Sequence, residues 1–217
     1  MKIGASLLSI PILSLKEKTE VLLSSGIDYL HIDIMDGNFV PNLAFTPSWT
    51  NQISLAYPSV ETDLHYMTSE TACENLFDDF QKSKPKRISF HLEAVKDPNK
   101  WIKRIVSSNC KAGIAICPET PLTQLSPYLC NVSFVLLMSV NPGFGGQIFI
   151  KNTYKKIEEL VKIRESKNYH FEIQVDGGIK TEHAVELKKL GVDLVVIGSY
   201  LINSDNPSKI VDSINKK

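Results

Sequence analysis

The stretch Leu194-Val195-Val196-Ile197-Gly198-Ser199 decides the fold class of this chain. Four apolar residues stand in a row, three of them β-branched, and a glycine ends the run. A strand with one solvated face alternates apolar and polar residues, whereas a parallel strand is covered on both faces and is apolar throughout. The stretch therefore predicts a buried parallel strand with helices packed on its sheet.

Seven further runs of this kind are spaced along the chain, and amphipathic stretches separate them. The predicted strands are Ile3–Leu8, Tyr29–Ile34, Val60–Tyr66, Arg87–Leu92, Lys111–Ile116, Phe134–Met138, Phe171–Val175 and Leu194–Ile197. The predicted helices are Leu15–Ser25, Pro98–Ser108, Thr153–Glu165, His183–Leu190 and Pro207–Asn215. The segment after Pro47 predicts no more than a brief helix. Alternation of strands and helices predicts parallel pairing, and eight such units predict a closed (β/α)8 TIM barrel. An open doubly wound sheet is the alternative.

The composition fits a single barrel domain over residues 1–217. Hydrophobic residues make up 43% and charged residues 22% of the chain, as in ordinary globular proteins. Lys+Arg and Asp+Glu are both 24, which argues against a nucleic-acid partner because such proteins carry a basic excess. No apolar run reaches the length of a membrane span, and Ser6, Ser9 and Pro11 interrupt the only run that resembles a signal peptide. Four cysteines without a Cys-x-x-Cys pair favour a cytoplasmic location.

Polar residues are concentrated where the predicted strands end. His31 and Asp33 are two residues apart and therefore face the same side of their strand, His65 ends the next strand, and Asp176 ends the seventh. In a closed barrel these ends meet at one mouth. Two imidazoles and two carboxylates suit a divalent cation such as Zn, Fe(II), Mn or Co. The alternative for each histidine is a hydrogen-bonded position in the core, but an unpaired Asp33 inside a barrel would be costly.

Glycine-rich loops follow the last three predicted strands. Their backbone N–H groups could bind an anion, and loops at this position are a common phosphate site in barrels. The alternative is that the glycines only form tight turns. The spacing does not match Gly-x-Gly-x-x-Gly after a first strand, so a dinucleotide fold is not predicted. The residues of these loops are Gly143, Phe144, Gly145, Gly146, Gly177, Gly178, Gly198 and Ser199.

Several further residues at strand ends are weaker candidates. Ser6 could contact a substrate, and Asp36 is predicted to cap or turn the loop before Gly37. His91 ends the fourth predicted strand, where it either lines a pocket or lies in the core. Three methionines are predicted to form an apolar layer around the metal site, with core filling as the alternative. These methionines are Met35, Met67 and Met138.

Taken together, these segments resemble the ribulose-phosphate 3-epimerase family over nearly the whole chain. The most specific matches are His31–Asn42, Ser139–Gln147 and Val175–Ile179. Shorter matches, at Ala5–Leu8 and Asp63–Met67, support them. The resemblance implies a barrel of the ribulose-phosphate-binding type, a homo-oligomer, and a role in the pentose phosphate pathway.

The resemblance also implies a site and a reaction. One divalent metal cation per subunit would be held by His31, Asp33, His65 and Asp176, and the two aspartates would also be the acid/base pair that inverts C3 of a ketose phosphate. The chain would thus interconvert D-ribulose 5-phosphate and D-xylulose 5-phosphate. The residues implied at the substrate are Ser6, His65, Gly143, Phe144, Gly145, Gly146, Asp176, Gly177, Gly178, Gly198 and Ser199.

The chain departs from the family pattern at five positions near the catalytic end, namely Ala5, Asn38, Thr46, Tyr66 and Cys117. None of these departures removes a predicted ligand or carboxylate, so they bear on the choice of sugar. A D-allulose 6-phosphate 3-epimerase is therefore the alternative activity. A related decarboxylase or synthase barrel is disfavoured, because the strand that carries the first predicted ligands lacks the lysine of the decarboxylase motif. A non-catalytic sugar-phosphate-binding barrel is a more remote alternative, and it predicts a lost ligand.

Overall fold

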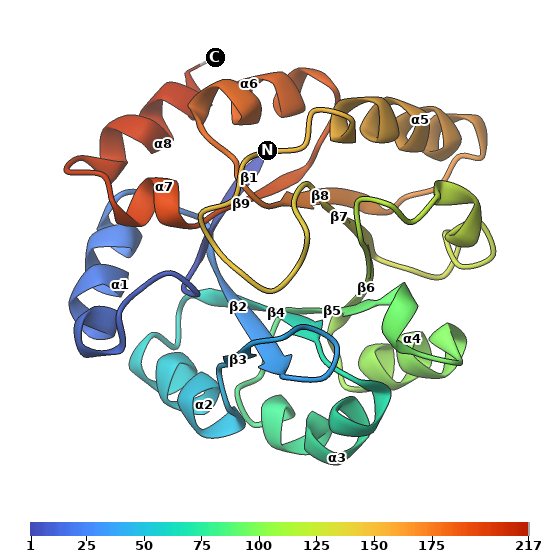
Figure 1. Ribbon diagram of the computed structural model, residues 1–217, viewed down its shortest axis with the longest axis horizontal. Coiled ribbons are helices and arrows are strands. Elements are labelled where there is room, and N and C mark those ends of the chain that lie inside the picture. Colours follow the sequence, from blue (N-terminus) through green and yellow to red (C-terminus); the bar gives the residue numbers. More distant parts are fainter. Residues whose placement is uncertain (217) are drawn as a thin grey trace.

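The computed structural model describes residues 1–216, and within them eight parallel strands form a closed barrel surrounded by helices (Figure 1). The strands are β1 (Lys2–Ser6), β2 (Tyr29–Asp36), β4 (Glu61–Met67), β5 (Arg87–His91), β6 (Lys111–Ile116), β7 (Phe134–Met138), β8 (Glu172–Asp176) and β9 (Leu194–Ile197). The ring closes because β1 pairs in parallel with both β2 and β9. A two-residue strand, β3 (Leu43–Ala44), pairs antiparallel with the end of β2. The predicted (β/α)8 barrel is confirmed, and the open sheet is wrong.

Helices cover the outer face of the barrel. They are α1 (Leu15–Ser24), α2 (Pro47–Ala56), α3 (Glu70–Gln81), α4 (Pro98–Ser107), α5 (Thr153–Ser166), α6 (Thr181–Lys189), α7 (Ser199–Ile202) and α8 (Pro207–Asn215). The connection from β6 to β7 contains only a 3-10 turn at Leu122–Gln124. In the part of the chain that the structure describes, no helix is both long and apolar enough to cross a membrane.

Three helices differ from the prediction, and one of them is the short α7, which was not predicted. The helix α2 has ten residues and is longer than the brief helix predicted. The Thr46 side chain accepts a hydrogen bond from a backbone N–H of its first turn, and Pro47 suits the first helical position. The helix α3 was not predicted at all. Ser69 caps it, and it buries a face made of Cys73, Phe77 and Phe80.

The strand register places polar side chains inside the barrel. Along β2 and β4, His31 lies opposite Asp63, Asp33 opposite His65, and Met35 opposite Met67. Alternate residues of a strand face opposite sides, so these pairs point inward while Leu30, Ile32 and Leu64 pack against the helices. The strand β2 continues to Asp36, two residues past its predicted end at Ile34.

Candidate metal centre and active site

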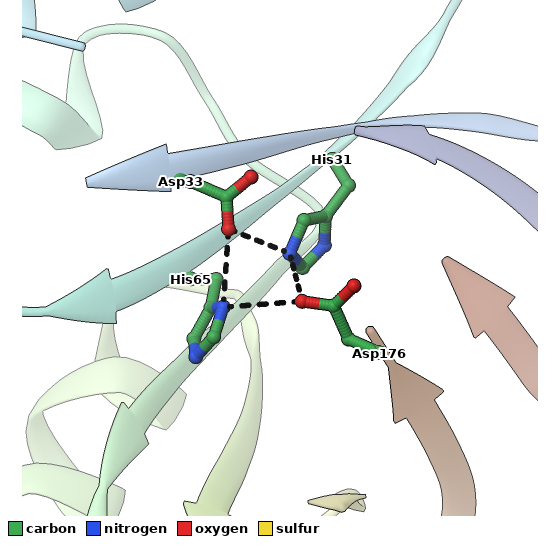
Figure 2. A group of neighbouring side chains, drawn as sticks. All are labelled: His31, Asp33, His65 and Asp176. Carbon is green, nitrogen blue, oxygen red and sulfur yellow. Dashed lines mark hydrogen bonds and ion pairs between the residues drawn. The ribbon is translucent and has the colours of Figure 1, made fainter. Parts of the chain in front are cut away.

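Four side chains from three strands converge inside the mouth of the barrel (Figure 2). His31 Nε2 lies 3.4 Å from Asp33 Oδ1 and 3.8 Å from Asp176 Oδ2. His65 Nδ1 lies 3.3 Å from the same Asp33 atom and 3.9 Å from the same Asp176 atom. Both imidazoles are fully buried, whereas the Asp176 side chain is 14% exposed. The structure thus brings together the four predicted ligands from strands β2, β4 and β8.

The donor atoms of this cluster fit a divalent cation. Each residue offers one nitrogen or oxygen, and all four atoms lie within 4.8 Å of one another. Zn–N and Zn–O bond lengths imply about 3.4 Å between neighbouring donors of a tetrahedral site, close to the separations found here. His31 Nε2 is buried but makes no hydrogen bond to any residue of 1–216. A buried nitrogen without a partner is costly, and a cation in the cluster would supply one.

The two aspartates of the cluster differ electrostatically. Burial disfavours the charge on Asp33, but the neighbouring His31 and His65 outweigh it and hold the Asp33 pKa well below its usual range. Burial raises the pKa of Asp176 to about 7; the carboxylates Asp33 and Asp63 add to this shift. Two carboxyl groups whose pKa values are pushed apart in this way are typical of acid/base pairs.

Asp63 orients the ring of His31, a role that the sequence prediction missed. Asp63 Oδ2 lies 2.9 Å from His31 Nδ1 and accepts a hydrogen bond of 2.6 Å from Gln174 Nε2. Asp63 and Gln174 are both fully buried. A carboxylate that binds the second nitrogen of a ligand histidine fixes its tautomer. Asp63 lies two residues before His65, and this spacing is the signal that could have identified it.

Ser6 supports the opposite side of the cluster. Its hydroxyl donates to Asp33 Oδ2 at 2.7 Å, and its side chain also lines the cavity above the cluster. Ser6 therefore holds one of the two carboxylates in place and is open to a bound molecule.

A cavity of about 740 Å³ opens from the cluster to the surface of the barrel mouth. Except for His65, which lies beneath it, all the substrate residues implied by the family resemblance line the cavity. Among the methionines, Met67 and Met138 line the cavity, whereas Met35 is buried outside it. His91 is fully buried and does not line it either. The structure thus assembles three glycine-rich loops, two aspartates and two methionines around one space.

Main-chain packing between the loops requires glycine at Gly178. Its φ is +62°, and a Cβ there would lie 2.6 Å from both Gln147 O and Phe149 N. The loop between β7 and α5, drawn in yellow, crosses the barrel mouth (Figure 1). Ser139 Oγ lies 2.8 Å from Asp176 O and 2.6 Å from Gly177 O, and its single hydroxyl hydrogen is shared between these two acceptors. The loops are therefore braced against one another next to the cluster.

Asp36 turns the loop after β2, as predicted. Its carboxylate accepts the backbone N–H groups of Asn38 and Phe39 at 2.9 and 3.2 Å. It also accepts the N–H and the hydroxyl of Ser69 at 2.9 and 2.7 Å. Asp36 thereby joins the end of β2 to the cap of α3.

Comparison with known proteins identifies the family. A family model described as the ribulose-phosphate 3 epimerase family matches residues 2–202. The chain belongs to this family. It is therefore an epimerase, an enzyme of the isomerase class. The resemblance inferred from the sequence motifs is confirmed.

Three relatives named ribulose-phosphate 3-epimerase match this family member over nearly its full length. The protein from Escherichia coli (strain K12) is 32% identical over 215 residues, covering 99% of this chain and 95% of its own. The protein from Serratia marcescens is 34% identical over 95% of this chain and 98% of its own. The protein from Helicobacter pylori (strain J99) is 34% identical over 99% of this chain and 96% of its own.

Solved structures of other enzymes share the fold of this epimerase. A 3-hexulose-6-phosphate synthase aligns with a TM-score of 0.72 at 14% identity, covering 100% of this chain and 99% of that one. A phosphoribosyl anthranilate isomerase from Thermus thermophilus aligns with a TM-score of 0.67 at 15% identity, covering 99% and 96%. At such identities the likeness establishes the barrel alone.

Proposed function

We propose that this epimerase interconverts D-ribulose 5-phosphate and D-xylulose 5-phosphate by moving a proton at C3. The observation that carries the proposal is the pair Asp33 and Asp176, which come from β2 and β8 and approach the same two imidazole nitrogens. The names of the three relatives favour this substrate over D-allulose 6-phosphate.

His31, Asp33, His65 and Asp176 would hold one divalent cation per subunit, such as Zn, Fe(II), Mn or Co. A bound cation would act as a Lewis acid that makes the hydrogen beside a ketone easier to remove. The fit of the donor atoms and the unpartnered His31 Nε2 support this assignment.

The two aspartates would exchange protons with opposite faces of C3. Without a metal, the neighbouring histidines outweigh burial and lower the pKa of Asp33, whereas burial raises the pKa of Asp176 to about 7, so the two carboxyl groups differ in their readiness to hold a proton. In the proposed reaction one of them would accept the proton and the other would donate one. Inversion of the centre needs the acceptor and the donor on opposite faces, and the reverse reaction exchanges their roles. The hydroxyl of Ser6 keeps Asp33 in position.

The glycine-rich loops would bind the phosphate of the substrate and fix C3 between the aspartates. Backbone N–H groups of Gly143–Gly146, Gly177, Gly178, Gly198 and Ser199 are the proposed donors, and all these residues line the same cavity. Binding energy from a distant phosphate lowers the entropic cost of holding the reacting carbon. Met67 and Met138 would keep the apolar side of the cavity dry.

The setting of the enzyme is part of the same proposal. We expect one domain over residues 1–217, a homo-oligomer, and a place in the pentose phosphate pathway. All four cysteines are free, which fits the reducing cytoplasm.

Turnover in D2O tests the two-aspartate mechanism. Each molecule of epimerised product should carry solvent deuterium at C3, measured by NMR or mass spectrometry, because the proton removed on one face is replaced on the other. Asp33→Asn and Asp176→Asn should each stop epimerisation, and their metal content must be measured alongside. Retention of protium at C3 by the wild-type enzyme would exclude the mechanism.

A further inference from the structure

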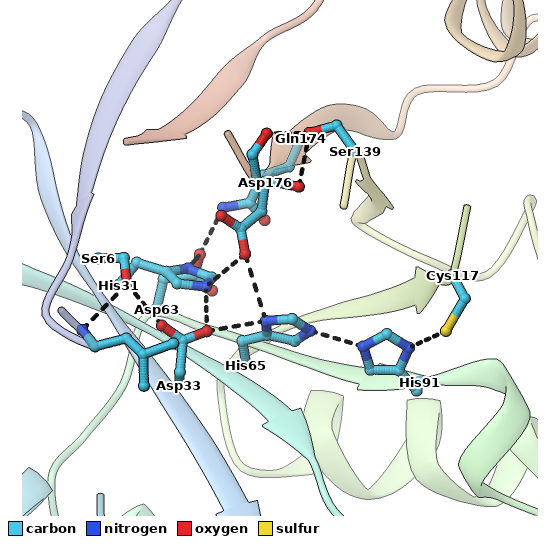
Figure 3. A network of polar contacts seen from close by, with 12 residues as sticks. Ser6, His31, Asp33, Asp63, His65, His91, Cys117, Ser139, Gln174 and Asp176 are labelled. Carbon is cyan, nitrogen blue, oxygen red and sulfur yellow. Dashed lines mark hydrogen bonds and ion pairs between the residues drawn. The ribbon is translucent and has the colours of Figure 1, made fainter. Parts of the chain in front are cut away.

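A chain of hydrogen bonds leads to Glu93 from the four-donor cluster, which is His31, Asp33, His65 and Asp176. Glu93 has no role in the proposed reaction. His65 Nε2 lies 2.9 Å from His91 Nε2 (Figure 3), and His91 Nδ1 lies 3.2 Å from Glu93 Oε2. The two imidazole rings meet edge to edge, with their planes inclined at 28° and their centroids 5.0 Å apart, and both are fully buried. Two buried ring nitrogens at this distance require that one of them carries a hydrogen and the other accepts it.

The orientation of Glu93 is fixed by donors at its other oxygen. Oε1 accepts the backbone N–H of Cys117 at 2.8 Å and the hydroxyl of Thr120. Oε2 is therefore left facing His91. Burial opposes ionisation of Glu93, but the hydrogen bonds from His91, Thr120 and Cys117 lower its pKa to about 2. Glu93 is thus a carboxylate at neutral pH and can only accept hydrogen bonds.

This orientation dictates where the hydrogens of both imidazoles lie. Because Glu93 only accepts, a neutral His91 bonded to it carries its hydrogen on Nδ1, and its Nε2 then presents a lone pair. A neutral His65 in turn donates through Nε2, which leaves the lone pair on its Nδ1. That lone pair faces Asp33 Oδ1 at 3.3 Å and Asp176 Oδ2 at 3.9 Å. A nitrogen lone pair facing carboxylates is repulsive unless a cation lies among them.

We infer that Glu93 acts through His91 as a positioning residue, fixing His65 in the tautomer whose Nδ1 lone pair can bind the proposed metal. The inference rests on the proposed role of the cluster as a metal centre. Carboxylates behind ligand histidines fix ring orientation and raise ligand basicity, and their loss typically costs 10–100-fold in metal affinity. His31 has Asp63 directly behind it, whereas His65 reaches its carboxylate through a second imidazole.

The inferred chain from Glu93 through His91 to His65, called the relay below, excludes a second cation site made by some of the same groups. His91, Glu93 and Cys117 offer three donor atoms within 4.8 Å of one another. The Cys117 Sγ lies 3.7 Å from His91 Nδ1. A cation bound there would need the Nδ1 lone pair of His91, which moves the hydrogen of His91 to Nε2 and that of His65 to Nδ1. His65 could then no longer bind a cation in the four-donor cluster, so the two arrangements are mutually exclusive.

Glu93→Gln tests the relay, because it should reverse the direction of the hydrogen bonds between residue 93, His91 and His65 while keeping a side chain of the same shape. The amide oxygen must stay with the Cys117 N–H, so the amide nitrogen faces His91 Nδ1 and donates to it. The hydrogen of His65 should move from Nε2 to Nδ1, as read from 15N–1H NMR of the imidazoles. The Kd for Zn²⁺, measured by competition with a chelator, should rise about 10–100-fold.

Cys117→Ala is the matched control, since it keeps the backbone N–H that holds Glu93 and removes only the thiol. Its Zn²⁺ affinity and its stoichiometry of one should equal those of the wild type. Unchanged tautomers and unchanged Zn²⁺ affinity in Glu93→Gln would overturn the relay. Two bound Zn²⁺ in the wild type and one in Cys117→Ala would overturn it in favour of the second cation site.

The wild-type protein alone provides a test if Glu93→Gln does not fold. In the Zn²⁺-loaded wild type, the relay requires hydrogens on His65 Nε2 and His91 Nδ1, and the opposite pattern would refute it. Each of these measurements reads metal binding or tautomers. The failure of the relay is thus distinguishable from a failure of the proposed epimerisation, which would appear as inactive wild-type enzyme.

Discussion

Gly178→Ala should damage the proposed phosphate site by forcing two loops apart. The new Cβ would lie 2.6 Å from Gln147 O and Phe149 N, which are main-chain atoms and cannot rotate away. Ordinary contact begins at 3.4 Å, so the loop between β7 and α5 must move by about 0.8 Å. A misplacement of about 1 Å at a positioned substrate can cost about 100-fold in rate. We therefore expect kcat/KM for ribulose 5-phosphate to fall by about 100-fold in a coupled epimerase assay.

Gly26→Ala separates this clash from the cost of the backbone conformation. Gly26 also has a positive φ, +87°, but its Cβ would meet only Val211, at 3.8 Å, far from the barrel mouth. Alanine in a left-handed conformation costs about 1–2 kcal/mol, so Gly26→Ala should lose that much unfolding free energy and keep wild-type kcat/KM. Inhibition by inorganic phosphate should weaken only in Gly178→Ala. Equal losses of kcat/KM in the two variants, or none in Gly178→Ala, would refute the reasoning.

Three further outcomes are expected. Asp63→Asn should weaken Zn²⁺ binding by about 10-fold in a chelator competition, because Gln174 Nε2 would keep the amide oxygen at the Oδ2 position, and a neutral amide oxygen is a weaker acceptor for the His31 Nδ1 hydrogen than a carboxylate; wild-type affinity would contradict the role of Asp63. Asp36→Asn should lower the Tm at neutral pH. Partial burial disfavours the charge on Asp36, but the hydrogen bonds from Ser69, Asn38 and Phe39 outweigh it and hold the Asp36 pKa below its usual range. The higher Tm of the wild type should therefore be lost as the pH falls below about 4 and the carboxylate becomes protonated. A Tm difference that does not depend on pH would contradict this role of Asp36. Unphosphorylated ribulose should show a far lower kcat/KM than ribulose 5-phosphate, because binding energy at the loops would be missing; equal values would argue against a phosphate site.

The barrel was predictable because several of its strands, such as β7 and β9, are apolar on both faces. Lys111–Ile116, Phe134–Met138 and Leu194–Ile197 have the predicted bounds. The helix α3 could have been predicted as well, because Ser69 is a favourable N-cap and its buried residues Cys73, Phe77 and Phe80 follow the i, i+4, i+7 spacing of an amphipathic helix. This signal was missed.

The donor cluster was predictable where it depended on spacing within one strand, and not where it depended on register between strands. His31 and Asp33 share a face because they are two residues apart. The contact of Asp63 with His31 exists because β2 and β4 pair with these two residues opposite each other. The contact of His65 Nε2 with His91 Nε2 depends in the same way on the pairing of β4 with β5. The offset between two neighbouring strands cannot be read from a sequence, so the contacts of Asp63 with His31 and of His91 with His65 were not predicted.

The closure of the ring between β1 and β9 also bears on how the protein folds. Residues 2–5 pair with residues 194–197, so this contact closes a loop of almost the entire chain, and contacts of such long range form at a high entropic cost. The first half of the chain carries His31, Asp33 and His65, but Asp176 reaches them only across the closed interior. A cation that needs all four donors would therefore be captured only at the end of folding, and the kinetics of metal uptake by the refolding chain would report the moment at which the barrel closes.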